Sequence, residues 1–319
     1  MAIAMLKPLK VLHEEVKTMK RDNFVLEAEK GIKIEVAEGK DGKVIIRAYN
    51  LVPLFDLSAN YANPPIPERY RHILGKWNEG FVIERVSDGS QFVWIPVGCL
   101  TPNGTIDGKN FSKRFGRRNY NNGQFFGAEY TETSSREFKE QTESVKKYGG
   151  FYFSRYNISI SPEGTPQSVK DVLPWVNIKH SGAKRIAATF ENSETVKSHL
   201  PFGEEYDSAF EWIIQMGAKT EKEVVGDSAN WGNYFNTSGS PLELMKTGSR
   251  SEWSVNNIFD MAGNIEEWTQ EQSGIYANVV RGGNYFTPGT YHSAAASRYG
   301  RQSNEYDNTI GFRIALYIK

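Results

Sequence analysis

Histidine and cysteine are the first candidates for chemistry in this chain, because they most often bind transition metals or act as nucleophiles. No two of the histidines have the spacing that places a pair of metal ligands on one face of a helix. They are His13, His72, His180, His199 and His292. The only cysteine is Cys99, so no disulfide can form within the chain, and Cys99 itself is expected to serve packing. The G-x-S-x-G nucleophile motif and a phosphate-binding loop are also absent.

The segment between Gly283 and Ile310 has a composition suited to recognition. It is rich in Tyr, Asn, Ser and Gly, which give a large contact area with few rotatable bonds and adaptable hydrogen bonding. We expect an exposed ligand-binding face here; the alternative is a loop-rich surface with ordinary tyrosines. The candidate residues are Tyr285, Phe286, Thr290, Tyr291, His292, Tyr299, Arg301, Asn304, Tyr306, Asp307 and Asn308.

Alternating and helical patterns predict the elements that position this segment. Asp207–Met216 places Phe210, Ile213 and Ile214 on one helical face, and Gly217 is suited to end that helix. A surface helix is expected within 134–147. Strands are predicted at Phe81–Val86, Gln91–Pro96, Gly149–Tyr156, Asn278–Arg281 and Arg313–Ile318, and a further helix at Ala183–Phe190.

Residues 1–67 are predicted to form a small N-terminal module, and residues 68–319 the main domain. The module contains a helical pattern at Val11–Lys20 and two strands, Gly31–Ala37 and Lys43–Tyr49, joined by a turn rich in Gly and Asp. A proline-rich linker follows at 60–67. Because a lone hairpin is marginally stable in water, we expect it to pack on the main domain or to support oligomerisation.

Three motifs in a fixed order carry a family resemblance. They are Asn257-Ile-Phe-Asp-Met-Ala-Gly-Asn-Ile-Glu-Glu-Trp268, Arg281-Gly-Gly283 and Ile310-Gly-Phe-Arg313. The region from Phe81 to Lys319 resembles the formylglycine-generating enzyme, or sulfatase-modifying factor, family. The resemblance implies a loop-rich α+β domain with the C-type lectin-like fold, preceded by the β-hairpin module. It also implies that Arg281 and Arg313 are buried and bond to carboxylates and carbonyls.

The resemblance further implies a calcium ion at Asp260, Gly263, Ile265 and Glu267, whose carboxylate and carbonyl oxygens are the hard ligands calcium prefers. The structural alternative is that Asp260 and Glu267 accept backbone donors of the turn. Both interpretations stay open at this point, and no other cofactor is required. Trp268 is expected to be a large buried anchor.

The enzymes of the family bind copper through two cysteines shortly after the Arg-Gly-Gly motif, or iron through a paired histidine motif. Residues 284–298 contain no cysteine, and Thr287 cannot replace a thiolate. We therefore expect a non-enzymatic binding protein whose ligand is a protein or a glycan on a cell surface. The alternative is a metal-dependent oxidoreductase of the formylglycine-generating or sulfoxide-synthase type.

The same C-terminal motifs also resemble retroelement-diversified variable proteins and suit a receptor-binding protein of a phage or prophage tail. Diversification of Asn codons yields most residue types between Gly283 and Ile310, but not Gln302 or Glu305. This interpretation adds a variable recognition surface to the expected binding function.

Charge and hydropathy exclude other classes of partner. Lys and Arg total 38, as do Asp and Glu, so the 319-residue chain has no net charge that would favour nucleic acid. No apolar run approaches the roughly 20 residues of a membrane span, and no signal-peptide pattern is present. We expect a soluble protein that is cytoplasmic when made; if it works outside the cell, it leaves by another route, such as lysis or a virion.

Overall fold

The computed structural model describes the backbone of residues 32–38, 44–50 and 130–131, and residues 64–97, 111, 115, 132, 134–275, 277–290 and 293–319 with their side chains. The predicted helix at Val11–Lys20, Cys99, Tyr291 and His292 lie outside these residues. The chain divides into two units, Met1–Leu51 and Val52–Lys319. No helix in the described part of the chain has the length and apolar character needed to cross a membrane.

The first unit contains one antiparallel pair of strands. Strand β1, Ile32–Glu38, pairs with β2, Val44–Asn50, and Ile32 lies opposite Asn50. This confirms the two strands predicted for the N-terminal module.

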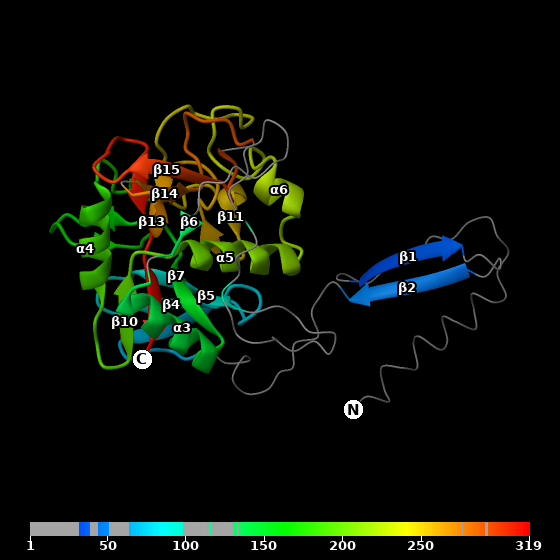
Figure 1. Ribbon diagram of the computed structural model, residues 1–319, viewed down its shortest axis with the longest axis horizontal. Helices are drawn as coiled ribbons and strands as arrows, with labels where there is room; N and C mark the ends of the chain where they lie inside the picture. Colours follow the sequence, from blue (N-terminus) through cyan, green and yellow to red (C-terminus); the bar gives the residue numbers. More distant parts are fainter. Residues whose placement is uncertain are drawn as a thin grey trace. The chain divides into compact units, whose positions relative to one another are not determined.

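The larger sheet of the second unit is antiparallel, with strand order β10-β17-β7-β5-β4-β3 (Figure 1). The two predicted strands around the turn at Gly89 are confirmed as β4 and β5. The strands are β3 Tyr70–Leu74, β4 Val82–Arg85, β5 Gln91–Pro96, β7 Gly150–Ser154, β10 Val196–His199 and β17 Ala315–Ile318.

The central strands of this sheet are buried on both faces, because successive side chains of a strand point to opposite sides. Val93 and Phe153 belong to the core on one face, together with helix α5, Gly203–Gln215. Trp94 and Tyr152 belong to the core on the other face, together with helix α4, His180–Phe190. The sheet therefore separates two hydrophobic cores.

The second sheet carries the C-terminal motifs. Its order is β15-β14-β13-β16, and β6 also pairs with β13. Strands β13 and β16 run parallel, and Trp268 lies opposite both Phe312 and Val280. This pairing brings the three motifs together. The strands are β6 Tyr130–Thr131, β13 Glu266–Ser273, β14 Ala277–Arg281, β15 Arg298–Gln302 and β16 Ile310–Phe312.

The remaining elements are one surface helix, α3, and several short segments. Helix α3 confirms the predicted surface helix: Ser135 Oγ accepts from the Phe138 amide at 3.0 Å at its start, and Gly149 ends it with a φ of 82°. These elements are α3 Arg136–Tyr148, α6 Glu221–Val225, η1 Ser251–Trp253, β8 Ser159–Ile160, β9 Pro166–Gln167, β11 Ser254–Val255 and β12 Ile258–Phe259.

Helix α5 begins four residues before the predicted start at Asp207. The Glu205 carboxylate accepts a hydrogen bond from the Phe202 amide at 2.7 Å and so satisfies a donor at the helix start. The predicted apolar face is confirmed, because Phe210 and Ile213 are fully buried. Gly217, with a φ of 68°, follows the last turn as expected.

Trp268 is the expected buried anchor, and helix α4 holds it. Its Nε1 donates to the Ile178 carbonyl at 2.9 Å, and the His180 ring meets the indole edge-on. The Nε2 of His180 donates to the Thr269 carbonyl at 2.9 Å. Burial lowers the pKa of His180 from 6.5 to about 4, so this imidazole is neutral at pH 7.

We expect His180 to make the protein less stable in acid. Between pH 6.5 and about 4, His180 is protonated in the unfolded chain but remains neutral in the folded protein. Stability is therefore complete above pH 6.5 and falls as the pH approaches about 4, by about 3 kcal/mol for a pKa change of this size. The variant His180→Gln keeps an N–H donor but does not titrate, so it should lose about 3 kcal/mol less over this range. Urea unfolding across the pH series measures the difference, and parallel curves for both proteins would contradict the expectation.

Candidate functional site

A group of buried charges, the Asp207 cluster, joins helix α5 to strands β13, β14 and β15. It consists of Asp207, Glu271, Arg281 and Arg298, all of them buried. Arg281 Nη2 donates to Asp207 Oδ1 at 2.9 Å, and Arg298 Nη2 donates to Asp207 Oδ2 at 2.6 Å. Arg298 Nε also donates to both Glu271 oxygens, at 2.9 and 2.8 Å. Because an unpaired buried charge costs several kcal/mol, these pairs fix the helix against the three strands.

Arg313 forms a second buried charge group beside the first. Its Nε donates to the two oxygens of Glu267 at 2.8 and 2.9 Å, and its Nη1 donates to the Ser154 carbonyl at 3.0 Å. Glu267 also accepts from Asn157 Nδ2 at 2.6 Å and from the Tyr206 hydroxyl. The structural role predicted for Arg281 and Arg313 is confirmed.

Two glycines fix the direction of the chain, Gly263 in the turn before β13 and Gly283 in the loop after β14. Gly283 has a φ of 68°, and a Cβ there would collide with the Ser293 carbonyl. Gly263 has a φ of 70°, and a Cβ there would collide with the Asn233 carbonyl. Only glycine fits both the left-handed backbone and the close approach. The loop after β14 therefore starts in a fixed direction.

Strand β15 and the loop after it present the group of side chains that we call the Tyr299 face: Tyr299, Arg301, Asn304, Tyr306 and Asn308. Tyr299 is 43% exposed and Tyr306 57%, and both asparagines are exposed. The Arg301 guanidinium lies 5.0 Å from the Tyr299 ring centre. From Arg301 to Asn308 half-buried and exposed residues alternate, so the loop displays every second side chain. Asp307 is half-buried, and its Oδ1 accepts from the Thr309 amide at 2.7 Å.

Tyr285 differs from the expectation of an exposed contact residue. It is 3% exposed, and its ring centre lies 4.4 Å from that of Phe286, which is 61% exposed. The Phe286 amide donates to Asn284 Oδ1 at 2.9 Å, in a turn where Phe286 is the outward side chain. Assigning Tyr285 to the exposed surface is therefore wrong. Its ring packs against that of Phe286, and its side chain is hydrogen-bonded to Asn308 of the Tyr299 face.

Glu266 ties the loop that bears Phe286 to the Tyr299 face, and the sequence analysis did not identify it. Its Oε2 accepts from Arg301 Nε at 3.0 Å and Nη2 at 2.9 Å, and its Oε1 accepts from Asn284 Nδ2 at 3.1 Å. Burial raises the pKa of Glu266, and the nearby Arg301 charge opposes that rise. The sequence did contain a signal for this role. A carboxylate in the buried segment Ile265–Trp268 needs a hydrogen-bonding or charged partner.

The family model described as the sulfatase-modifying factor enzyme 1-like domain (FGE-sulfatase) matches residues 82–318, which is more than half of the chain. The chain belongs to this family. The domain has the α+β, C-type lectin-like architecture expected from its C-terminal motifs. A comparison with curated proteins found no match.

Several solved structures are similar to this sulfatase-modifying factor domain. PvdO from Pseudomonas aeruginosa shares 16% identity with a TM-score of 0.38, over 53% of this chain and 81% of PvdO. CarF shares 16% identity with a TM-score of 0.36, over 53% of this chain and 87% of CarF. Treponema denticola variable protein 1 shares 19% identity with a TM-score of 0.29, over 70% of this chain and 84% of that protein.

The residues expected to hold calcium have protein partners in this domain. Glu267 is bonded to Arg313, Tyr206 and Asn157, as described above. Asp260 Oδ2 accepts from Thr247 Oγ1 at 2.7 Å and from the Gly248 amide at 2.8 Å, while its buried Oδ1 has no hydrogen-bond partner. The Gly263 carbonyl accepts from the Ile265 amide at 2.9 Å. The Glu267 carboxylate is thus occupied by protein donors, and calcium at this segment stays a prediction.

The described histidines lie apart and have local partners. His199 Nε2 bonds to Glu205 at 2.8 Å, and His72 Nε2 lies 2.9 Å from the Gly75 carbonyl. His180 is bonded to the Thr269 carbonyl. Among the residues with described side chains, no group of three His, Cys, Asp or Glu is placed to hold a metal ion.

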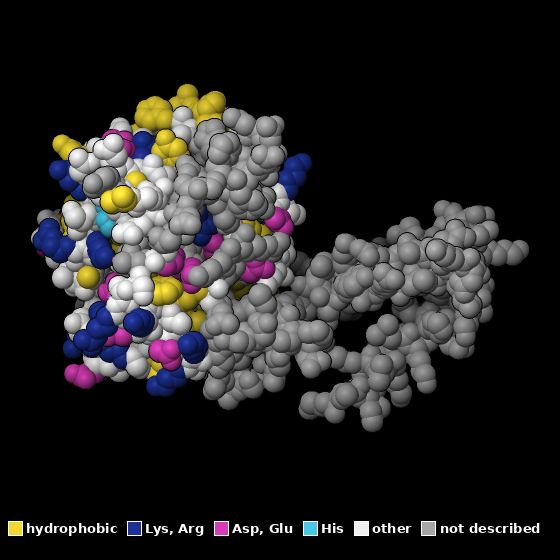
Figure 2. Space-filling model, in the orientation of Figure 1, with side chains coloured by type: hydrophobic (Ala, Val, Ile, Leu, Met, Phe, Trp, Pro, Cys, Tyr) yellow, Lys and Arg dark blue, Asp and Glu magenta, His cyan; other side chains and the backbone are white. Residues whose placement is uncertain are grey.

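Two further exposed apolar residues were not identified by the sequence analysis. Phe235 is 50% exposed and Leu242 56% exposed. The Phe235 amide donates to the Thr287 carbonyl at 3.2 Å, so this loop lies beside the one that bears Phe286. Figure 2 shows hydrophobic side chains gathered at the end of the domain where the yellow and orange loops of Figure 1 lie. Thr290 is half-buried in this region, at a bridge to Asp227.

Proposed function

We propose that this sulfatase-modifying factor domain binds a protein or glycan ligand through Phe286 and the Tyr299 face, and performs no reaction on it. The observation that carries the proposal is the contrast between exposed aromatic side chains and the buried charges beneath them. Exposed tyrosine and phenylalanine provide contact area at low entropic cost, while the ion pairs keep the supporting strands rigid. Apolar patches of this kind mark interaction sites.

The residue content of the site supports binding without catalysis. The chain's only cysteine is Cys99, so the loop from Gly283 to Ile310 offers no thiolate to a soft metal. Two buried carboxylates beside the surface, those of Glu266 and Glu271, are bonded to Arg301 and Arg298. Both hold arginines of strand β15 in place.

Replacing Phe286, Tyr299 and Tyr306 together by alanine should abolish ligand binding and leave folding intact, because all three side chains are exposed. Tyr285→Ala is the matched comparison: it removes a buried ring and should cost about 3 kcal/mol of stability. Binding is measured on a glycan array and on displayed cell-surface ectodomains, and stability by urea unfolding.

Loss of the folded state in the triple variant would show these rings to be core residues. Unchanged binding by a folded triple variant would place the ligand elsewhere. Stoichiometric iron or copper in the purified protein would contradict a domain that only binds.

We further propose that the surface is diversified among sibling chains and serves a phage or prophage protein that binds a receptor. Asn304, Tyr306 and Asn308 are exposed and can change without disturbing the core. Arg281, Gly283 and Arg313 cannot change, for the steric and electrostatic reasons given above.

Sequencing of sibling chains tests the diversification. The differences should concentrate at the exposed positions between Gly283 and Ile310 and spare the buried ones. Differences spread evenly over the domain surface would leave a fixed binder and reject this part of the proposal.

A further inference from the structure

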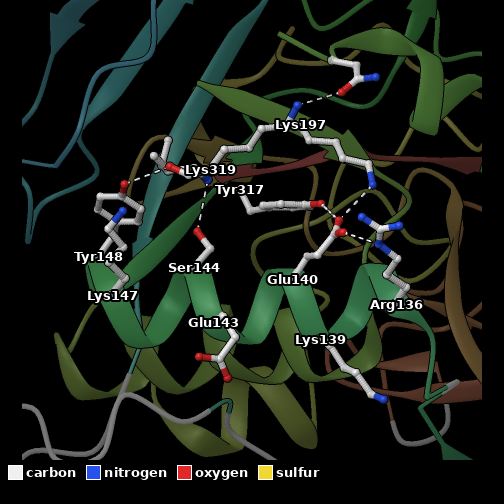
Figure 3. Close-up of a pocket in the computed structure, with 12 residues that line it drawn as sticks. Arg136, Lys139, Glu140, Glu143, Ser144, Lys147, Tyr148, Lys197, Tyr317 and Lys319 are labelled. Carbon is white, nitrogen blue, oxygen red and sulfur yellow. Dashed lines mark hydrogen bonds and ion pairs between the residues drawn. The ribbon is translucent and has the colours of Figure 1, made fainter. Parts of the chain in front are cut away.

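A cavity lies between helix α3 and strands β10 and β17. Its volume is about 740 Å³, within the range of small-molecule sites. In Figure 1, α3, β10 and the C-terminus lie at the bottom of this unit, whereas β15 lies at its top. The α3 wall carries Arg136, Glu140 and Ser144, and the strand wall carries Lys197 and Tyr317 (Figure 3). The cavity shares no residue with the Tyr299 face.

The lining of this cavity carries an excess of positive charge. Its basic side chains are Arg136, Lys139, Lys147, Lys197 and Lys319, and its acidic side chains are Glu140 and Glu143.

The Glu140 carboxylate is hydrogen-bonded to other residues of the cavity lining. It accepts from the Tyr317 hydroxyl at 2.6 Å, Arg136 Nε at 2.7 Å and Lys197 Nζ at 3.2 Å. The hydrogen bonds from Tyr317 and Arg136 lower the pKa of Glu140 to about 2, so it is ionised at neutral pH. Its single negative charge is shared between Arg136 and Lys197, and Glu137 also lies 3.8 Å from Lys197 Nζ.

Three lysines of the lining have no acidic partner in the described part of the chain. Glu143 pairs at 2.9 Å with Lys146, which is not part of the lining. Lys319 Nζ donates only to neutral acceptors, among them Asn192 Oδ1 at 2.9 Å. Lys147 Nζ lies 4.6 Å from the Tyr148 ring centre, and Lys139 has no ion pair with any residue whose side chain the structure describes. Among the described residues, the lining of the cavity thus includes three ammonium groups without an acidic partner.

We propose that this cavity binds a small ligand through a phosphate group. An ammonium group is a compact point charge that suits the several oxygens of a phosphate, whereas carboxylate recognition favours a free arginine fork. The one arginine of the lining is already paired with Glu140. A soluble phosphate compound and a phospholipid headgroup present the same chemistry to the three lysines.

Calorimetric titration with inorganic pyrophosphate, in about 10 mM salt to limit screening, tests the proposal. We expect saturable binding at one site, weakened about tenfold or more in the variant Lys139→Gln/Lys147→Gln/Lys319→Gln, since three exposed charge contacts are lost. The matched control Lys184→Gln/Lys222→Gln/Lys246→Gln removes the same charge from other surfaces and should bind like the unaltered protein. Absence of saturable binding, or equal weakening in both variants, overturns the proposal. Urea unfolding confirms that both variants are folded.

Vesicle sedimentation separates the two sources of phosphate. Retention by vesicles containing phosphatidic acid, with release by pyrophosphate, assigns the site to a lipid headgroup. Pyrophosphate binding without vesicle retention assigns it to a soluble phosphate compound. If the vesicles retain the control variant and the variant Lys139→Gln/Lys147→Gln/Lys319→Gln equally, overall charge explains the attraction and the proposed site is rejected. Because the cavity and the Tyr299 face share no residue, either proposal can fail without the other.

Discussion

One buried carboxylate, that of Asp207, is shared by two arginines that come from different strands. Removing charges from water is costly, and the cost is recovered only when geometry and hydrogen bonding are both good. Here Arg281 and Arg298 approach the two oxygens of Asp207 separately, and Glu271 completes the pairing of Arg298. Helix α5 and strands β14 and β15 must therefore keep one relative position for these charges to remain paired.

The exposed surface depends on this constraint. Strand β15 begins at Arg298 and continues directly to Tyr299 and Arg301, so the Asp207 cluster fixes the base of the Tyr299 face. Glu266 then holds Arg301 on the same side of the sheet and joins it to Asn284. A surface held in this way can vary its outward side chains while its backbone stays in place. The binding that we propose would reside in those side chains and not in the fold.

Much of this arrangement could be predicted from the sequence because it depends on local rules. Alternation predicted β4 and β5, and the spacing of Phe210 and Ile213 predicted the buried face of α5. The glycine after Arg281 and the buried arginines were recognisable from the C-terminal motifs, which also identified the family.

The rest depends on contacts between residues distant in sequence. Tyr285 and Tyr299 are the same residue type in one segment, yet a ring contact with Phe286 accompanies the burial of the first, and the second lies on an open strand. The partner of Arg281 is 74 residues away on α5, and that of Arg301 is 35 residues away on β13. No local pattern specifies such pairs, so Asp207 and Glu266 became visible as positioning residues only in three dimensions.

The most direct measurement is the equilibrium stability of Asp207→Asn, which keeps the size of the side chain but leaves Arg281 and Arg298 without their shared charge. If the buried cluster holds the second sheet to α5, this change should cost about 3–5 kcal/mol in urea unfolding. Asn304→Ala and Asn308→Ala, on the exposed face, should each change stability by less than about 0.5 kcal/mol. A cost for Asp207→Asn no greater than that of the surface changes would contradict the account.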